Sequence, residues 1–300
     1  MPTPRADKVK PLERALDNPT LHPNALTENE RDPAFKWHTH CGSPRSSQVF
    51  CLSAFGTLRS LREKNRVLED LFRRALPDFP HRPRSRRWEI IPEAEKPELL
   101  SEHGSNQPTS IDALCVSSKE VICIESKFAT DAMHGFGGCS QFSRKACRGY
   151  RGPGSDLATS TAVWCRLESW EGSRSPRAYW SIGTRYFQPS VFQQQGPEDS
   201  CPLRGPNYQL MRNFLFAASL AEKEGKTYFA VIAIAPRSVS AKLANQVDDF
   251  RRNVLLPEFQ GRVALIDYET YASCLTESGD KECAELATFL EGRISEIIHR

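Results

Sequence analysis

Several common signatures of enzymes and of membrane proteins are missing from this 300-residue chain. It has no glycine-rich phosphate loop of the P-loop type and no G-x-S-x-G element, which argues against a P-loop nucleotidase and a serine hydrolase. The longest apolar runs, at 214–221 and 229–235, are far too short to cross a bilayer. No apolar leader follows Met1, and we therefore expect a cytoplasmic protein whose cysteines stay mostly reduced.

Charge of neither sign is in large excess. Forty Lys and Arg against 37 Asp and Glu give a net charge of +3, which does not by itself predict nucleic-acid binding. Basic side chains nevertheless cluster in two segments. The clustered cations are Arg82, Arg84, Arg86 and Arg87 in one segment and Arg59, Arg62, Lys64 and Arg66 in the other. They form either two solvated surfaces or contacts to phosphates beside a cleavage site.

The composition divides the chain into two parts. Residues 1–45 are rich in Pro, Asn, Thr and charge without sustained periodicity, which predicts a flexible or loosely packed N-terminal extension. Residues 46–300 have the composition of a folded domain. Within them, residues 129–206 are rich in Gly, Ser, Cys and Trp and form a Cys-rich insert.

Hydrophobic periodicity predicts alternating helices and strands in the second part. We expect helices at 61–76, 207–224, 240–255 and 280–298, and strands at 88–91, 111–116, 121–128, 228–235 and 263–267. This order predicts an α/β fold in which a mixed central sheet is flanked by helices.

Two charged residues, Glu125 and Lys127, fall inside the apolar run 121–128. Such a run predicts a buried strand, where charges are rare unless they are paired or bind a metal. Residues two apart in a strand share a face, so both side chains point to the same side of the sheet. A turn at 117–120 would fold the preceding strand, with Asp112 near its start, beside them. The three ionisable groups are therefore predicted to meet at one point.

Two carboxylates beside a lysine suit the hydrolysis of a phosphodiester. Asp112 and Glu125 offer the oxygen ligands that Mg²⁺ prefers. The ion can lower the pKa of a water molecule and can stabilise charge on the phosphodiester. Lys127 can orient or deprotonate the attacking water, or neutralise the charge at phosphorus.

This pattern resembles the catalytic core of the PD-(D/E)XK nuclease superfamily, which includes restriction endonucleases, RecB-like exonucleases and junction-resolving enzymes. Ser110-Ile111-Asp112 matches its first acid motif and Glu125-Ser126-Lys127 its E-x-K motif, although the usual proline before the acid is absent and Pro108 lies nearby instead. The resemblance covers about residues 60–240. The run Tyr-Gln-Leu-Met-Arg-Asn at 208–213, after a cysteine-bearing insert, is also similar to a group of bacterial restriction-endonuclease-like proteins.

The resemblance implies a restriction-endonuclease-like fold and an endonuclease that depends on Mg²⁺ or Mn²⁺. Its substrate would be DNA, in restriction, defence or repair. Homodimers are frequent among restriction enzymes, and the sequence leaves the oligomeric state open.

The resemblance also implies supporting residues on two helices. An acid on the first helix often contributes to the site, and Glu69 is the leading candidate ahead of Glu63 and Glu89. The helix after the E-x-K strand often carries a polar residue that faces the site, and Gln209 fits this role, with Asn213 one turn away. Because position 213 is not tyrosine, the Q-x-x-x-Y motif of RecB-like nucleases is absent.

The insert carries cysteines with loose spacing and no C-x-x-C pair. They are Cys139, Cys147, Cys165 and Cys201. They either ligate Zn²⁺ or an iron–sulfur cluster or are ordinary buried cysteines. His134 could be a ligand or approach DNA from a loop, and we favour a structural histidine. The spacing of His38 and His40 resembles that of metal ligands, but we discount them because they fall in the N-terminal extension.

Two other classes of function stay open. The chain could be a nucleic-acid-binding protein that keeps the nuclease fold without catalysis, with DNA binding insensitive to Mg²⁺ and no product. It could also be a metal-cluster protein organised by the insert cysteines. The intact set of two acids and a lysine favours the nuclease.

Overall fold

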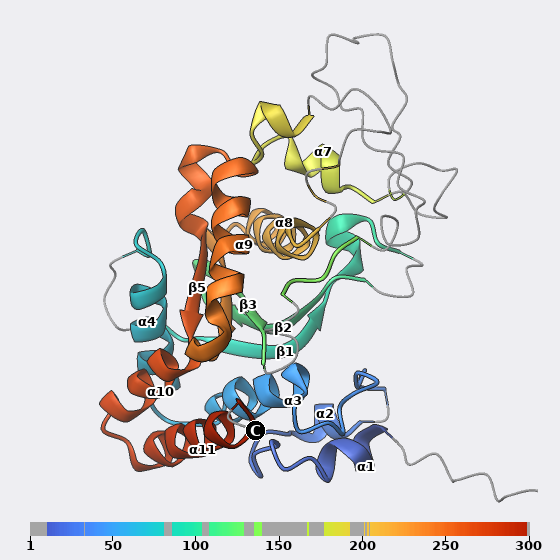
Figure 1. The fold of residues 1–300 in the computed structure, drawn as a ribbon. Helices are drawn as coiled ribbons and strands as arrows, with labels where there is room; N and C mark the ends of the chain where they lie inside the picture. The colour runs from blue at the N-terminus through green and yellow to red at the C-terminus, as the bar shows by residue number, and fades with distance from the viewer. Residues whose placement is uncertain are drawn as a thin grey trace, which may run out of the picture.

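A five-stranded mixed sheet between two helical layers organises the chain in the computed structural model (Figure 1). The structure describes residues 11–32, 34–80, 86–103, 108–128, 135–139, 167, 177–192, 201, 203 and 205–298.

The strands lie in the sheet in the order in which they occur in the chain. They are β1 (Glu89–Glu95), β2 (Ser110–Val116), β3 (Glu120–Ser126), β4 (Tyr228–Ala235) and β5 (Val263–Asp267). β1 to β3 pair antiparallel, whereas β4 is parallel to both β3 and β5. β3 therefore joins the antiparallel part of the sheet to the parallel part. The mixed α/β sheet predicted from the sequence is confirmed.

Helices cover both faces of the sheet (Figure 1). One face packs against α8 (Asn207–Lys223) and α9 (Ser240–Asn253). The other packs against α3 (Ser47–Cys51), α4 (Lys64–Ala75), α10 (Tyr268–Glu277) and α11 (Lys281–Ile298). Among the described residues, no helix is long and apolar enough to span a bilayer.

The residues of β3 alternate between the two hydrophobic cores. Val121 and Cys123 belong to the core under α8, whereas Ile122 and Ile124 belong to the core on the opposite face. Every residue of β3 is buried, as expected for an apolar strand covered on both sides. By this alternation Glu125 faces α8.

Short helices and buried polar contacts characterise the described part of the N-terminal segment. It contains α1 (Pro11–Leu16) and α2 (Glu28–Arg31). The side-chain amide of Asn18 donates to the carbonyl oxygens of Cys41 at 2.7 Å and Ser43 at 2.6 Å. Buried polar groups tend to find such partners, and these contacts tie the described part of the segment together.

Candidate active site

The Glu125 carboxylate is buried at the end of β3 and held by two amides from α8. Its side chain is 2% exposed. Gln209 Nε2 donates to Oε1 at 2.6 Å and Asn213 Nδ2 donates to Oε2 at 2.6 Å. Because Gln209 and Asn213 are one helical turn apart, both reach the same carboxylate from one face of α8.

The Lys127 ammonium lies against this carboxylate. The Lys127 N–H donates to the Ile234 carbonyl at 2.8 Å, which keeps the backbone aligned with β4 beyond the last residue of β3. Its Nζ atom lies 3.0 Å from Glu125 Oε1 and donates to Gln209 Oε1 at 3.1 Å. The side chain is 11% exposed, so the ammonium is largely shielded from water.

Asp112 completes the group from β2. Regular pairing of β2 with β3 runs no further than Ala113 opposite Ile124. Beyond that pair, the Ser126 N–H donates to Asp112 Oδ2 at 2.7 Å. Burial and the negative charges of Glu125 and Glu93 raise the pKa of Asp112 well above its usual range, although Lys127 and the Ser126 N–H act in the opposite direction. The structure thus brings Asp112, Glu125, Lys127 and Gln209 together.

A further carboxylate, Glu93, lies beside Asp112 and was not predicted from the sequence. Pro92 pairs with Ala113 and Ala94 with Ile111, so Glu93 stands opposite Asp112 across β1 and β2. Its backbone has a φ of 48°, in the left-handed region. Such strained residues tend to cluster at functional sites.

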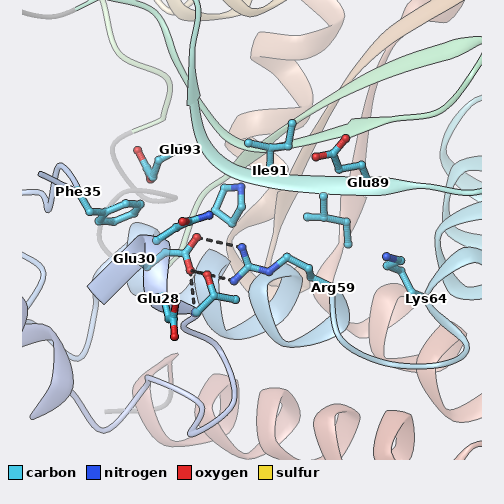
Figure 2. Close-up of a pocket in the computed structure, with 12 residues that line it drawn as sticks. Glu28, Glu30, Phe35, Arg59, Lys64, Glu89, Ile91 and Glu93 are labelled. Atoms are coloured by element: carbon cyan, nitrogen blue, oxygen red, sulfur yellow. Dashed lines mark hydrogen bonds and ion pairs between the residues drawn. The ribbon is translucent and has the colours of Figure 1, made fainter. Parts of the chain in front are cut away.

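The Glu93 side chain is 7% exposed and has polar neighbours from two segments. Ser110 Oγ donates to its Oε2 at 3.1 Å, and His38 Nε2 lies 3.7 Å from the same oxygen. Glu93 lines a cavity of about 750 Å³ between β1 and the segment that contains α2. Figure 2 shows the residues that line this cavity. The sequence would have revealed Glu93 only if the predicted strand had been extended past Pro92, which an edge strand tolerates.

Glu93→Gln is expected to remove part of the pH dependence of folding stability. Burial above all raises the pKa of Glu93 to about 7. The folded protein then holds this proton more tightly than the unfolded chain, so stability falls as pH rises from about 4.5 to 7, by up to about 3 kcal/mol. Urea denaturation at pH 5 and pH 8 should show a smaller loss for Glu93→Gln than for wild type. An unchanged loss in this variant, or an equal change in the control Glu95→Gln, would contradict the prediction.

A family model described as REase-ARP, restriction endonuclease associating with ARP, matches residues 8–293. The chain belongs to this family. The match extends over nearly the whole chain and includes the N-terminal segment. Membership of a restriction-endonuclease family implies that the substrate is DNA. No curated protein and no solved structure matches the chain.

In this member of the restriction-endonuclease family, Glu69 lies away from the site, and the prediction that it faces the site is not met. Glu69 is buried in α4 and pairs with Arg73 at 2.9 Å. Burial raises its pKa, whereas the nearby Arg86 and Arg73 lower it. Arg86 in turn pairs at 3.3 Å with Glu120, the first residue of β3. Glu69 therefore belongs to the opposite end of β3 from Glu125.

The other predicted acids also lie elsewhere. Glu63 directly precedes α4. Glu89 pairs with Val116 at the far end of the β1–β2 ladder from Asp112. The amphipathic pattern of a helix identifies its buried face but not the part of the sheet that this face covers.

Three of the clustered arginines have partners inside the protein. Arg59 pairs with Glu30 at 2.9 Å, as Figure 2 shows, and Arg86 pairs with Glu120. Arg66 Nη1 donates to the Ser278 carbonyl at 3.0 Å. These contacts favour a structural role for the three guanidinium groups over phosphate contact. Residues 81–85 lie outside the described part of the chain.

The metal-cluster prediction for the insert stays a prediction. Cys139 is buried and Cys201 half-buried, whereas Cys147, Cys165 and His134 lie outside the described residues. Among the residues that the structure describes, no group of three or more His, Cys, Asp or Glu side chains could hold a metal ion.

Proposed function

We propose that this protein is a Mg²⁺- or Mn²⁺-dependent endonuclease of the PD-(D/E)XK type that hydrolyses phosphodiester bonds in DNA. The observation that supports this most strongly is the contact of Lys127 with Glu125 at 3.0 Å, together with the Ser126 N–H that ties Asp112 to the same strand. Membership of a restriction-endonuclease family supports DNA as the substrate.

The donor set fits a hard divalent cation. Glu125 Oε1 receives two donors and Oε2 receives one, from Asn213, which leaves Oε2 room for a further ligand. Asp112 uses Oδ2 for the Ser126 N–H and would offer Oδ1. Among the described residues no third His, Cys, Asp or Glu joins the two carboxylates in a metal-binding group. Such a pair suits Mg²⁺, which is usually held by one or two carboxylates and completes its shell with water and phosphate oxygens. When bound, such an ion would stabilise the negative charge that develops on the phosphodiester.

Lys127 would act on the scissile phosphate directly. Its ammonium is held by Glu125 and Gln209 within a largely buried position. A cation fixed in this way can donate to a phosphate oxygen and orient the attacking water without reorganising during the reaction. Gln209 sets this position, because its amide oxygen accepts from Lys127 while its nitrogen donates to Glu125.

Asp112→Asn is expected to abolish cleavage without unfolding the protein. The raised pKa of Asp112 means that its surroundings disfavour the charged form, so a neutral isostere is tolerated. Asparagine can also accept the Ser126 N–H through its oxygen. We expect cleavage of supercoiled plasmid and of unmodified phage DNA with Mg²⁺, none with EDTA, and a loss of about 100-fold or more in Asp112→Asn.

The matched control is Asp248→Asn on α9, an exposed aspartate that pairs with Arg251 and Arg252. It should cleave as wild type does. Equal activity in Asp112→Asn and wild type would reject the proposed site. DNA binding that is insensitive to Mg²⁺ and gives no product would instead support the non-catalytic alternative.

A further inference from the structure

A short segment after β3, residues 135–139, lies over Lys127 and is held by glutamines from two helices. The Gly137 N–H donates to Gln209 Oε1 of α8 at 2.8 Å. The Phe136 N–H donates to Gln246 Oε1 of α9 at 3.1 Å. Two successive backbone amides of this segment are therefore anchored to separate helices.

The position of this segment is coupled to the position of the lysine. Gln209 Oε1 accepts from both the Gly137 N–H and the Lys127 ammonium. Lys127 Nζ also lies 5.7 Å from the centroid of the Phe136 ring, within reach of a cation–π interaction. A shift of residues 135–139 would therefore change the contact of the ammonium with the Phe136 ring directly, and its contact with Gln209 indirectly.

The contact between Gln246 and this segment depends on a glycine. Gly135 has a φ of +83°, and a Cβ atom on it would lie 2.5 Å from Gln246 Nε2. The absence of a side chain at position 135 thus lets the Gln246 amide approach closely enough to accept the next N–H along the chain.

We propose that Gln246 is a positioning residue for the Lys127 ammonium. By accepting the Phe136 N–H, it holds residues 135–139. The Phe136 ring then stays beside the Lys127 ammonium, and the Gly137 N–H fixes the Gln209 oxygen that accepts from this ammonium. The inference builds on the proposed nuclease and assigns α9 a part in it. Gln246 acts through the intervening segment and does not contact the phosphate.

The test compares Gln246→Leu, Gln246→Glu and the matched control Asn245→Ala on the exposed neighbouring position of α9. In steady-state cleavage of a plasmid with Mg²⁺, Gln246→Leu should lower kcat by about 10- to 100-fold while KM stays within about twofold, since a small misplacement of a reacting group is costly. Gln246→Glu keeps the acceptor oxygen and should retain most of kcat. Gly135→Ala, which displaces Gln246, should resemble Gln246→Leu. Wild-type kcat in Gln246→Leu, or an equal loss in Gln246→Glu, would overturn the proposal.

A second readout does not need cleavage. Selective ¹³C labelling of lysine gives NMR signals for the Cε methylene groups without modifying the amines, and the Lys127 signal is assigned by its absence in Lys127→Ala. The ring current of Phe136 should displace this signal in wild type, Gln246→Glu and Asn245→Ala, and the displacement should shrink in Gln246→Leu. Such shifts in a protein that cuts no DNA would reject the nuclease but keep the positioning role. A cleaving protein whose Lys127 signal is the same in Gln246→Leu as in wild type would reject the positioning role alone.

Discussion

Lys127→Ala is expected to reduce DNA cleavage by about 100- to 1,000-fold, the usual cost of removing one fixed donor from a developing negative charge. The lysine is held at 3.0 Å from Glu125 and at 3.1 Å from Gln209, and no rearrangement is required to present it to a phosphate. The loss should appear in kcat, measured with plasmid DNA and Mg²⁺. DNA binding measured with Ca²⁺ in place of Mg²⁺ should change far less.

The fold should survive this change. In Lys127→Ala the Glu125 carboxylate keeps its bonds from Gln209 and Asn213. Lys223→Ala is the matched control, because Lys223 is 55% exposed at the end of α8 and pairs with Glu98. The control should cleave normally. If Lys127→Ala also cleaved normally, the role assigned to the lysine would have to be abandoned.

Arg86→Met is expected to destabilise the protein by about 3–5 kcal/mol, because it leaves a buried carboxylate without its cation. The side chains of Arg86 and Glu120 are 6% and 0% exposed, and they pair at 3.3 Å at the start of β3. Glu69 would also lose a favourable positive charge. Urea denaturation, analysed for midpoint and slope, would measure the change.

The double variant Arg86→Met/Glu120→Gln should recover most of the lost stability, because no unpaired charge then stays at the start of β3. Arg237→Met is the matched control for an exposed pair. Arg237 is 66% exposed and pairs with Asp267 at 3.1 Å, so its loss should cost far less than the loss of Arg86. A double variant as unstable as Arg86→Met would show that the cost does not arise from the uncompensated carboxylate.

The apolar strands and the centre of the candidate site could be predicted because their signals are local. β4 and β5 match the predicted ranges 228–235 and 263–267, since β4 is an unbroken apolar run and β5 is apolar up to its last residue, Asp267. Glu125 and Lys127 share a face by the period of a strand, and Gln209 and Asn213 share one by the period of a helix. The contact between these two pairs could not be derived from either period, because it requires α8 to pack against β3 in the folded protein.

The predictions that failed depended on long-range geometry. Glu93 was missed because the predicted strand 88–91 stops short of it, whereas β1 is an edge strand and continues past Pro92 to Glu95. Glu69 was predicted to contribute to the site but lies at the opposite end of β3, because helical periodicity does not fix the axial position of a helix on a sheet. α10 was missed because it begins directly after β5, where Asp267 caps it by accepting the Thr270 N–H.

Lys127 and Gln209 hydrogen-bond each other although they are 82 positions apart in the chain. The entropic cost of closing a loop grows only with the logarithm of its length, and each doubling adds about 0.6 kcal/mol. The stretch between these two side chains can therefore lengthen or shorten during evolution at little thermodynamic expense to their contact. Changes in length would have to spare residues 135–139, whose backbone amides donate to Gln209 and Gln246.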